Sequence, residues 1–107
     1  MPDVLSRYPQ LTGIVTVNDA VAWGARQYCP AHKISIPTDL GIIGFDNQAW
    51  AELHNPPLTT VNMNDHEMGY QAVKCPLDRL DRPQSPTRIV SVATELLIRG
   101  STILLSQ

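Results

Sequence analysis

The sequence has few basic residues, and those it has are scattered. Eight Lys and Arg stand against ten Asp and Glu, so the formal net charge at pH 7 is −2. Chains that bind nucleic acid usually present a basic patch or stripe to the phosphate backbone. We therefore expect no direct nucleic-acid contact by this chain.

The sequence also lacks long apolar runs and catalytic signatures. No segment approaches the roughly 20 apolar residues that cross a bilayer, and the first ten residues do not have the basic and then apolar layout of a signal peptide. A GxSxG elbow, a P-loop and a GxGxxG motif are all missing. These absences predict a cytoplasmic chain that does not contact a membrane, is not an enzyme and needs no cofactor.

Cysteine and histidine are too sparse to suggest a metal site. Neither of the two cysteines, Cys29 and Cys75, belongs to a CxxC motif or a Cys/His cluster. The three histidines, His32, His54 and His66, have no paired ligand spacing such as HxxxH. The sequence therefore predicts no metal ligand and two buried, inert thiols.

The composition that is present is typical of one globular domain, with 43% hydrophobic and 17% charged residues in a chain of 107. A β-branched run at 12–17 predicts a buried strand. The stretch AVAWGARQY that follows predicts a helix capped by Asn18 or Asp19, which should fray or kink near Pro30. Residues 40–45 predict a second strand, apolar enough to be covered on both faces.

A strand, a helix and a second strand in succession are typical of a βαβ unit, whose two strands are parallel. The carboxyl ends of parallel strands meet at one edge of the sheet, where open α/β sheets bind their ligands. Asn18 and Asp19 follow the first strand, and Asp46 and Asn47 follow the second. These four polar side chains are predicted to project from one rim.

The second half of the chain continues the alternation. AWAELH predicts a short helix or turn, and NPPLTTV predicts an extended entry into a brief strand. NDHEMGYQAVKCPLDRLD predicts a second helix, capped by Asn64 or Asp65 and interrupted at Pro76. Alternating residues at 89–93 then predict a further strand, followed by an apolar run.

Four segments of the chain carry a family resemblance when they are taken together. They are LTGIVTVNDAVAWGA, IPTDLGIIGFDN, PPLTTVNMNDHEMGYQAV and TELLIRGST. In order and spacing they resemble the signature segments of LacI/GalR-type bacterial transcriptional regulators, over about residues 9–102. The resemblance implies an α/β fold class, namely a parallel-sheet βαβ fragment of the two-lobed, type I periplasmic-binding-protein-like fold. It covers only the C-terminal part of the effector-binding domain, so the family's helix-turn-helix has no counterpart here.

The resemblance also implies how the chain is divided between the lobes. Residues 1–59 would belong to the C-terminal lobe, 60–92 would form the crossover with a helix and a strand of the N-terminal lobe, and 93–107 would form the returning strand. Such a piece leaves apolar faces uncovered, and uncovered apolar faces promote association. A dimer or larger assembly is expected.

Five positions are implied as functional by the resemblance. Asn18 and Asp46 resemble effector contacts, where amide and carboxylate groups hydrogen-bond the hydroxyls of a sugar or the polar edge of a nucleoside-like ligand. Met63 lies where the crossover passes the cleft and is a third candidate. Trp23 and His54 resemble positions in the subunit interface.

Other interpretations of the same residues stay open. From the residues alone, Trp23 could be an ordinary core side chain and Asp46 a solvated loop acid. A phosphoacceptor receiver domain would make Asp46 the phosphorylated residue, but it also needs a lysine after a late strand, and the only lysines are Lys33 and Lys74. A periplasmic-type sugar-binding protein has the same fold but normally carries a signal peptide. Lys33 stands where the family usually ends its first helix with glycine, so Lys33 is expected in the left-handed region.

Overall fold

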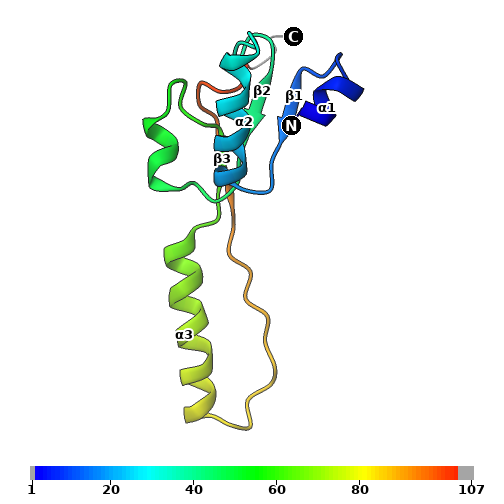
Figure 1. Ribbon diagram of the computed structural model, residues 1–107. Coiled ribbons are helices and arrows are strands. Elements are labelled where there is room, and N and C mark those ends of the chain that lie inside the picture. The colour runs from blue at the N-terminus through cyan, green and yellow to red at the C-terminus, as the bar shows by residue number, and fades with distance from the viewer. Residues whose placement is uncertain (1, 104–107) are drawn as a thin grey trace.

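The computed structural model describes residues 2–103 and is elongated, with principal extents of 60 × 29 × 26 Å (Figure 1). One long helix, α3 (Asp65–Asp81), projects from a body that holds the other elements, and residues 82–94 return along it. The body contains α1 (Pro2–Arg7), β1 (Gly13–Val15), α2 (Asp19–Ala31), β2 (Gly41–Ile43), the 3₁₀ helix η1 (Ala49–Leu53), β3 (Thr60–Asn62) and β4 (Glu95–Leu97). Among the described residues, no helix is both long enough and apolar enough to cross a membrane.

The strands form two small sheets that adjoin each other. β1 and β2 pair in parallel, with Ile14 opposite Ile42, and this confirms the predicted βαβ unit. β3 and β4 pair antiparallel, with Val61 opposite Leu96. The amide of Gly44, just after β2, donates to the carbonyl of Thr59 at 2.9 Å, which joins the two sheets. The end of β2 therefore lies beside the start of β3.

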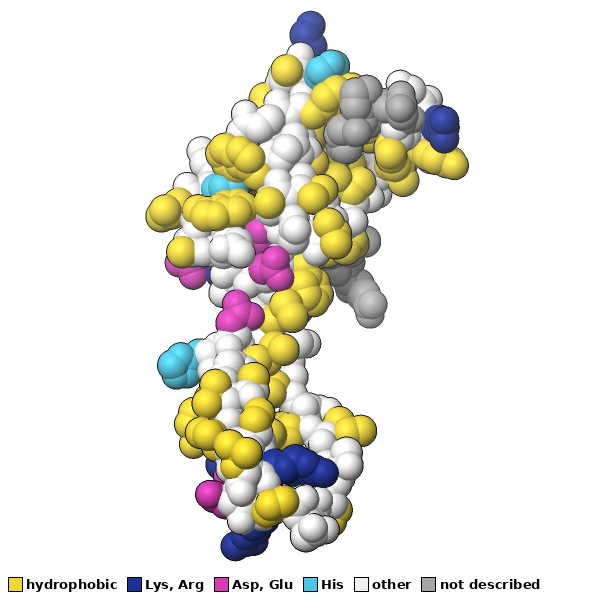
Figure 2. Space-filling view, turned by 60° about the horizontal axis from the view of Figure 1, so that its bottom comes forward, with side chains coloured by type: hydrophobic (Ala, Val, Ile, Leu, Met, Phe, Trp, Pro, Cys, Tyr) yellow, Lys and Arg dark blue, Asp and Glu magenta, His cyan; other side chains and the backbone are white. Residues whose placement is uncertain are grey.

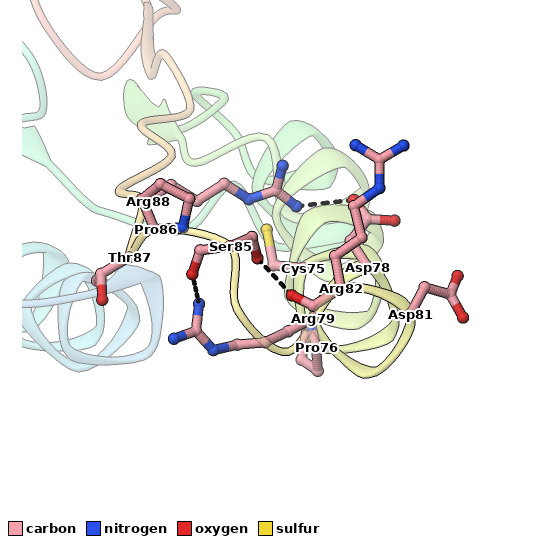
Figure 3. Close-up of a pocket in the computed structure, with 10 residues that line it drawn as sticks. All are labelled: Cys75, Pro76, Asp78, Arg79, Asp81, Arg82, Ser85, Pro86, Thr87 and Arg88. Atoms are coloured by element: carbon pink, nitrogen blue, oxygen red, sulfur yellow. Dashed lines mark hydrogen bonds and ion pairs between the residues drawn. The ribbon is translucent and has the colours of Figure 1, made fainter.

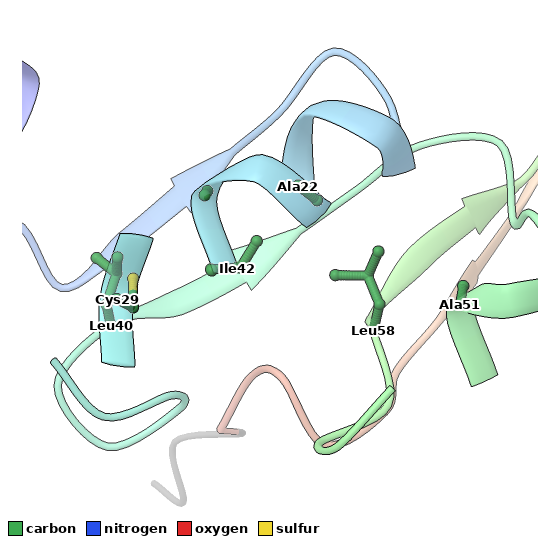
Figure 4. Close-up of a cluster of buried hydrophobic side chains, with 7 residues drawn as sticks. Ala22, Cys29, Leu40, Ile42, Ala51 and Leu58 are labelled. Atoms are coloured by element: carbon green, nitrogen blue, oxygen red, sulfur yellow. The ribbon is translucent and has the colours of Figure 1, made fainter. Parts of the chain in front are cut away.

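A small apolar core lies between α2 and the sheet (Figure 4). The core residues on α2 recur every three or four positions, so one face of the helix meets the strands. The buried apolar residues are Ala22, Ala25, Cys29, Leu40, Ile42, Ala51 and Leu58. Burial raises the pKa of the Cys29 thiol, which keeps it protonated and unreactive. Cys75 is only partly buried, so the prediction of two buried thiols is correct for Cys29 alone.

Proline does not divide either long helix. α3 continues through Pro76 to its end, so the predicted interruption was wrong, whereas α2 ends at Ala31, within the stretch near Pro30 where fraying or a kink was predicted. Pro30 lies in the last turn of α2, where only the bond to the carbonyl of Arg26 is lost. Pro76 likewise removes one bond of a helix that is 17 residues long. Lys33 has a φ of 59° just beyond α2, as predicted for the position of a left-handed cap.

The predicted strand at 89–93 is absent. Residues 88–94 have no regular structure, and Ile89 is 92% exposed. A strand needs a neighbour that accepts and donates its backbone bonds, and the three residues of β3 pair with β4 instead. The returning strand predicted at 93–107 is thus limited to β4, and residues 104–107 lie outside the described part of the chain.

The start of α3 also differs from the prediction. Asn64 occupies the N-cap position, but it has a φ of 60° and its side chain makes no capping bond. Its amide instead donates to Oδ1 of Asn62 at 3.0 Å. Asp65 begins the helix, where its charge is favourable at the positive end of the helix dipole. The chain conformation at the start of α3 is therefore stabilised from β3 rather than by a side-chain cap.

The apolar side chains of α3 are uncovered. No residue of the helix is buried, and hydrophobic side chains lie over the projecting arm in Figure 2. The large ones are 43–76% exposed: Met68, Tyr70, Val73, Leu77 and Leu80. Helices in proteins owe most of their stability to packing of an apolar face. This arm therefore presents a surface suited to covering by further polypeptide.

Candidate functional site

The carboxyl ends of β1 and β2 lie side by side. The amide of Thr16 donates to the carbonyl of Ile43, and the amide of Asp19 donates to the carbonyl of Phe45, both at 2.9 Å. The parallel pairing thus continues beyond the assigned strands. Asn18 and Asp46 consequently lie at the same edge, which we call the rim.

Asn18 has a defined local role at the rim. Its backbone is extended, with a φ of −161°, and its Oδ1 accepts a hydrogen bond from the amide of Val21 at 2.9 Å. This is the geometry of a helix N-cap, so Asn18 caps α2. The Nδ2 group makes no hydrogen bond within residues 2–103, so it can donate to a molecule at the rim.

Asp19 does not project from the rim, contrary to prediction. Its side chain is fully buried, where Oδ1 accepts from the Thr60 hydroxyl at 2.6 Å and Oδ2 accepts from the Gln48 amide at 2.7 Å. A carboxylate can leave water only when such bonds replace its hydration. Its place in the first turn of α2 adds the favourable end of the helix dipole. Asp19 therefore ties α2 to β3 and does not contact a ligand.

Asp46 and Asn47 form a turn in an unusual backbone conformation. Their φ angles are 107° and 54°, in the left-handed region that residues other than glycine seldom adopt. The turn is held by bonds from the Asp46 amide to the carbonyl of Val61 at 3.1 Å and from the Asn47 amide to Oγ1 of Thr60 at 3.3 Å. The Asp46 side chain is partly exposed and makes no hydrogen bond in the described region, which leaves its carboxylate available.

Met63 is partly buried and comes one residue after β3. It lies two residues beyond Val61, whose carbonyl holds the turn at Asp46. The segment that carries Met63 is therefore attached to the rim. The structure connects Asn18 and Asp46 through paired backbone, and it connects Met63 to them only through this segment.

Arg99 is part of the same arrangement and was missed from the sequence. Its side chain is only 14% exposed. Nη1 donates to the carbonyl of Leu58 at 3.1 Å, and Nη2 donates to Oδ1 of Asn47 at 2.9 Å and to Oε1 of Glu52 at 3.2 Å. The only signal for it in the sequence is an arginine that directly follows the apolar run LLI.

The residues after Arg99 fix the strands beneath the rim. The buried hydroxyl of Ser101 donates to the carbonyl of Ile42 at 2.6 Å and accepts from the amide of Thr59 at 2.8 Å. The hydroxyls of Thr59 and Thr102 are also hydrogen-bonded, at 2.8 Å. The LTT and RGST segments are thus bonded to each other and to β2. Their hydroxyl groups have a structural role that was not predicted from the sequence.

A second feature is an aromatic surface made of Trp23, Trp50 and His54. The ring centroids of Trp23 and His54 are 4.2 Å apart, those of Trp50 and His54 are 5.1 Å apart, and the two tryptophans are edge to face at 6.2 Å. Together with Ala20 they line a shallow pocket of about 290 Å³. Trp23 is 44% exposed, so it is not a core tryptophan. Trp50 was not singled out from the sequence.

His54 is held neutral within this aromatic surface. Its Nδ1 is buried and has no hydrogen-bond partner among residues 2–103. Burial, and next the positive charge of Arg26, lower the pKa of His54, while Asp19 opposes the shift. Arg26 itself donates to the carbonyls of Asn55 and Pro56. Because the folded pKa lies below the unfolded value of about 6.5, the stability from neutral His54 is present above that pH and is lost as the pH falls.

A larger pocket than that of the aromatic surface lies elsewhere. A pocket of about 990 Å³ is formed between the end of α3 and residues 85–88 (Figure 3). Arg88 pairs with Asp78 at 2.8 Å there, and Nη1 of Arg79 donates to the carbonyl of Ser85 at 3.2 Å. Half-exposed ion pairs of this kind contribute little, and no rim residue lines the pocket. Within the described ranges there is also no cluster of three or more metal-ligating side chains.

An acid and an amide at the carboxyl ends of adjacent parallel strands are typical of the edge at which α/β proteins bind their ligands. The family model for the periplasmic binding protein-like domain matches residues 1–102. The chain belongs to this family, and within it to the effector-binding domains of LacI/GalR-type transcriptional regulators. The predicted family and fold class are thus confirmed, and the family is one of transcriptional regulators and not of enzymes.

Individual relatives support this assignment. The HTH-type transcriptional repressor PurR of Pasteurella multocida (strain Pm70) is 29% identical over 94% of this chain and 30% of its own length. A LacI family regulator from Enterococcus faecalis V583, solved with bound ribose, has a TM-score of 0.88 and 30% identity over 98% of this chain and 39% of that one. One from Arthrobacter sp. FB24, in complex with lactose, has a TM-score of 0.83 and 27% identity over 94% and 38%. The chain therefore spans well under half the length of these proteins.

Proposed function

We propose that this chain is the effector-binding and dimerisation portion of a regulator that senses a small molecule, most simply a sugar, in the cytoplasm. In the full-length protein, effector binding would control a repressor's N-terminal helix-turn-helix, which lies outside this sequence. The observation that carries the proposal is the free carboxylate of Asp46 at the rim beside Asn18. The bound ribose and lactose of the two solved relatives support a sugar.

The chemistry of the rim suits hydroxyl groups. The Asp46 carboxylate accepts two hydrogen bonds in a fixed fork, and the free Nδ2 of Asn18 donates to a hydroxyl oxygen. A molecule that lacks these hydroxyls would leave both groups without partners, which is costly in a closed cleft. Met63 would add an apolar contact. A nucleoside-like molecule, with a ribose and a polar edge, is the second candidate because it offers the same hydroxyls.

The two-lobed arrangement explains the uncovered arm. We assign residues 1–59 to the C-terminal lobe, 60–92 to the crossover and the N-terminal lobe, and 93–107 to the return. The apolar face of α3, with Leu80 76% exposed, would then pack against the remainder of the N-terminal lobe. The rest of the effector cleft would come from that lobe as well.

The effector proposal predicts a ligand-dependent rise in stability. With ribose, lactose and adenosine as probes in thermal-shift measurements, at least one is expected to stabilise the 107-residue chain, by about 2.7 kcal/mol at 100 times its Kd. Asp46→Ala should abolish the shift, because the fork of acceptors is lost. Asp81→Ala, which removes an exposed acid at the far end of α3, should retain it. A shift that survives in Asp46→Ala, or none with any probe, would count against the proposal.

The aromatic surface is proposed as the dimer contact. Large aromatic side chains around a shallow apolar pocket are typical of interface centres, and the neighbouring Leu53 is 82% exposed. Trp23→Gln is expected to weaken dimerisation about 30-fold, as hot-spot residues do, in sedimentation equilibrium. Tyr8→Gln, at a side chain just after α1 that is 51% exposed, is the control and should not change dimerisation. A monomeric wild-type chain, or a dimer indifferent to Trp23→Gln, would contradict this assignment.

A further inference from the structure

We propose that Arg99 is a positioning residue that orients the Asp46 carboxylate for effector binding, acting through Asn47. The inference rests on the proposed function for the role of Asp46. Arg99 does not reach the effector itself in this scheme. It fixes the turn from which Asp46 projects.

Arg99 is anchored to buried residues of the body. Its amide donates to Oγ1 of Thr59 at 2.8 Å, and the same hydroxyl donates to the carbonyl of Arg99 at 3.2 Å. Nη1 donates to the carbonyl of Leu58 at 3.1 Å. Leu58 and Thr59 are at most 1% exposed, so these partners do not move easily. The guanidinium therefore occupies a fixed place beside the rim.

The turn at Asp46 and Asn47 needs such an anchor. Two successive non-glycine residues in the left-handed region persist only when their surroundings fix them from several sides. Hydrogen bonds to the backbone carbonyl of Val61 and to the side-chain Oγ1 of Thr60 fix the two amides. The bond from Nη2 of Arg99, at 2.9 Å, fixes the side chain of Asn47. Because no described residue hydrogen-bonds the Asp46 carboxylate, its direction is set by this turn alone.

The arrangement requires arginine in particular. Its planar fork reaches Leu58, Asn47 and Glu52 together, from two nitrogens that the guanidinium holds in one plane. A lysine ammonium at the end of a flexible stem is a single point charge and cannot span these three acceptors. Glu52 is 71% exposed, so its bond contributes least to the anchor. The link to Asn47 is the one that bears on the rim.

The first test is amide hydrogen exchange in the 107-residue chain without ligand. Arg99→Met is expected to speed exchange of the Asp46 and Asn47 amides about tenfold, while leaving the amide of Ile42 in β2 unchanged. Glu52→Gln, which removes only the exposed partner, should exchange like the wild type. If the Ile42 amide also exchanges faster in Arg99→Met, the same comparison is made with Arg99→Lys, because lysine keeps the aliphatic stem and the positive charge. Unchanged exchange at Asp46 and Asn47 would overturn the proposal.

The second test separates positioning from a general structural role. Asn47→Gly removes the acceptor and adopts a φ of 54° without strain. In the Asn47→Gly background, Arg99→Met should not speed exchange of the Asp46 amide further. A purely structural arginine would instead speed this exchange equally in both backgrounds, and that result would overturn the proposal. In calorimetry, the Arg99→Met variant should bind ribose about tenfold more weakly than the wild type, although Asp46 is still present. If the wild type does not bind ribose, that sugar assignment fails, and the exchange results still decide the role of Arg99.

Discussion

Gly44→Ala is expected to lower the free energy of unfolding by about 3 kcal/mol, or to prevent folding altogether. A Cβ at this position would overlap Oδ1 of Asp19 and lie 3.0 Å from Cδ2 of Leu58. Both neighbours are fully buried and have no room to move aside. Displacing the carboxylate would also break its bond to the Thr60 hydroxyl. Urea denaturation followed by tryptophan fluorescence measures the loss.

Gly41→Ala provides the matched control for this prediction. Gly41 begins β2, three residues before Gly44, and a Cβ there would meet its nearest neighbours at 3.7 Å, which is ordinary contact. Neither glycine has a positive φ, so alanine fits the backbone at both positions. The control should change stability by less than about 1 kcal/mol. Equal losses in the two variants would show that close approach to Asp19 is not the reason for glycine at 44.

Asp19→Ala is expected to destabilise the chain by about 3–5 kcal/mol. The substitution removes two short bonds to a charged acceptor, from the Thr60 hydroxyl and from the Gln48 amide, each worth about 1.5–3 kcal/mol. It also leaves the fully buried Thr60 hydroxyl without that partner. The measurement is again equilibrium denaturation, with circular dichroism to confirm that α2 is retained.

Asp19→Asn is the informative companion of this variant. The amide has the shape of the carboxylate, so its oxygen can accept from Gln48 while its Nδ2 donates to Oγ1 of Thr60. A loss of only about 1–2 kcal/mol is expected, because the charge is gone but both contacts remain. If Asn were as damaging as Ala, the negative charge itself would be the stabilising feature. A loss below about 1 kcal/mol in Asp19→Ala would contradict a structural role.

The βαβ unit and its rim could be predicted because their signals are local. An apolar run, a short polar cap and a second apolar run are enough to place Asn18 and Asp46 at neighbouring strand ends. The inward direction of Asp19 could not be predicted in the same way, since its partner Thr60 is 41 residues further along the chain. Adjacent polar residues at a helix start look alike in the sequence, and packing decides which one is buried.

The errors in the second half of the chain have a similar origin. Alternation at 89–93 indicates a strand, but a strand forms only beside a partner, and β3 is already paired. Arg99 was not singled out because its acceptors, Asn47 and Leu58, are 52 and 41 residues away. Trp50 was passed over since its contact with Trp23 also joins distant segments. Long-range contacts of this kind cannot be predicted from a local sequence pattern.

α2 begins at the rim and carries the aromatic surface one turn later. Asn18 and Trp23 are five positions apart, a rise of roughly 7.5 Å along the helix axis, and the buried Asp19 lies between them. No loop separates Asn18 from Trp23, so the two residues are connected by continuous helix. In the proposed function, a molecule that draws Asn18 toward Asp46 would act on the same helix that carries Trp23. Under the proposed function, occupancy of the rim and the fit between subunits would therefore be linked through α2.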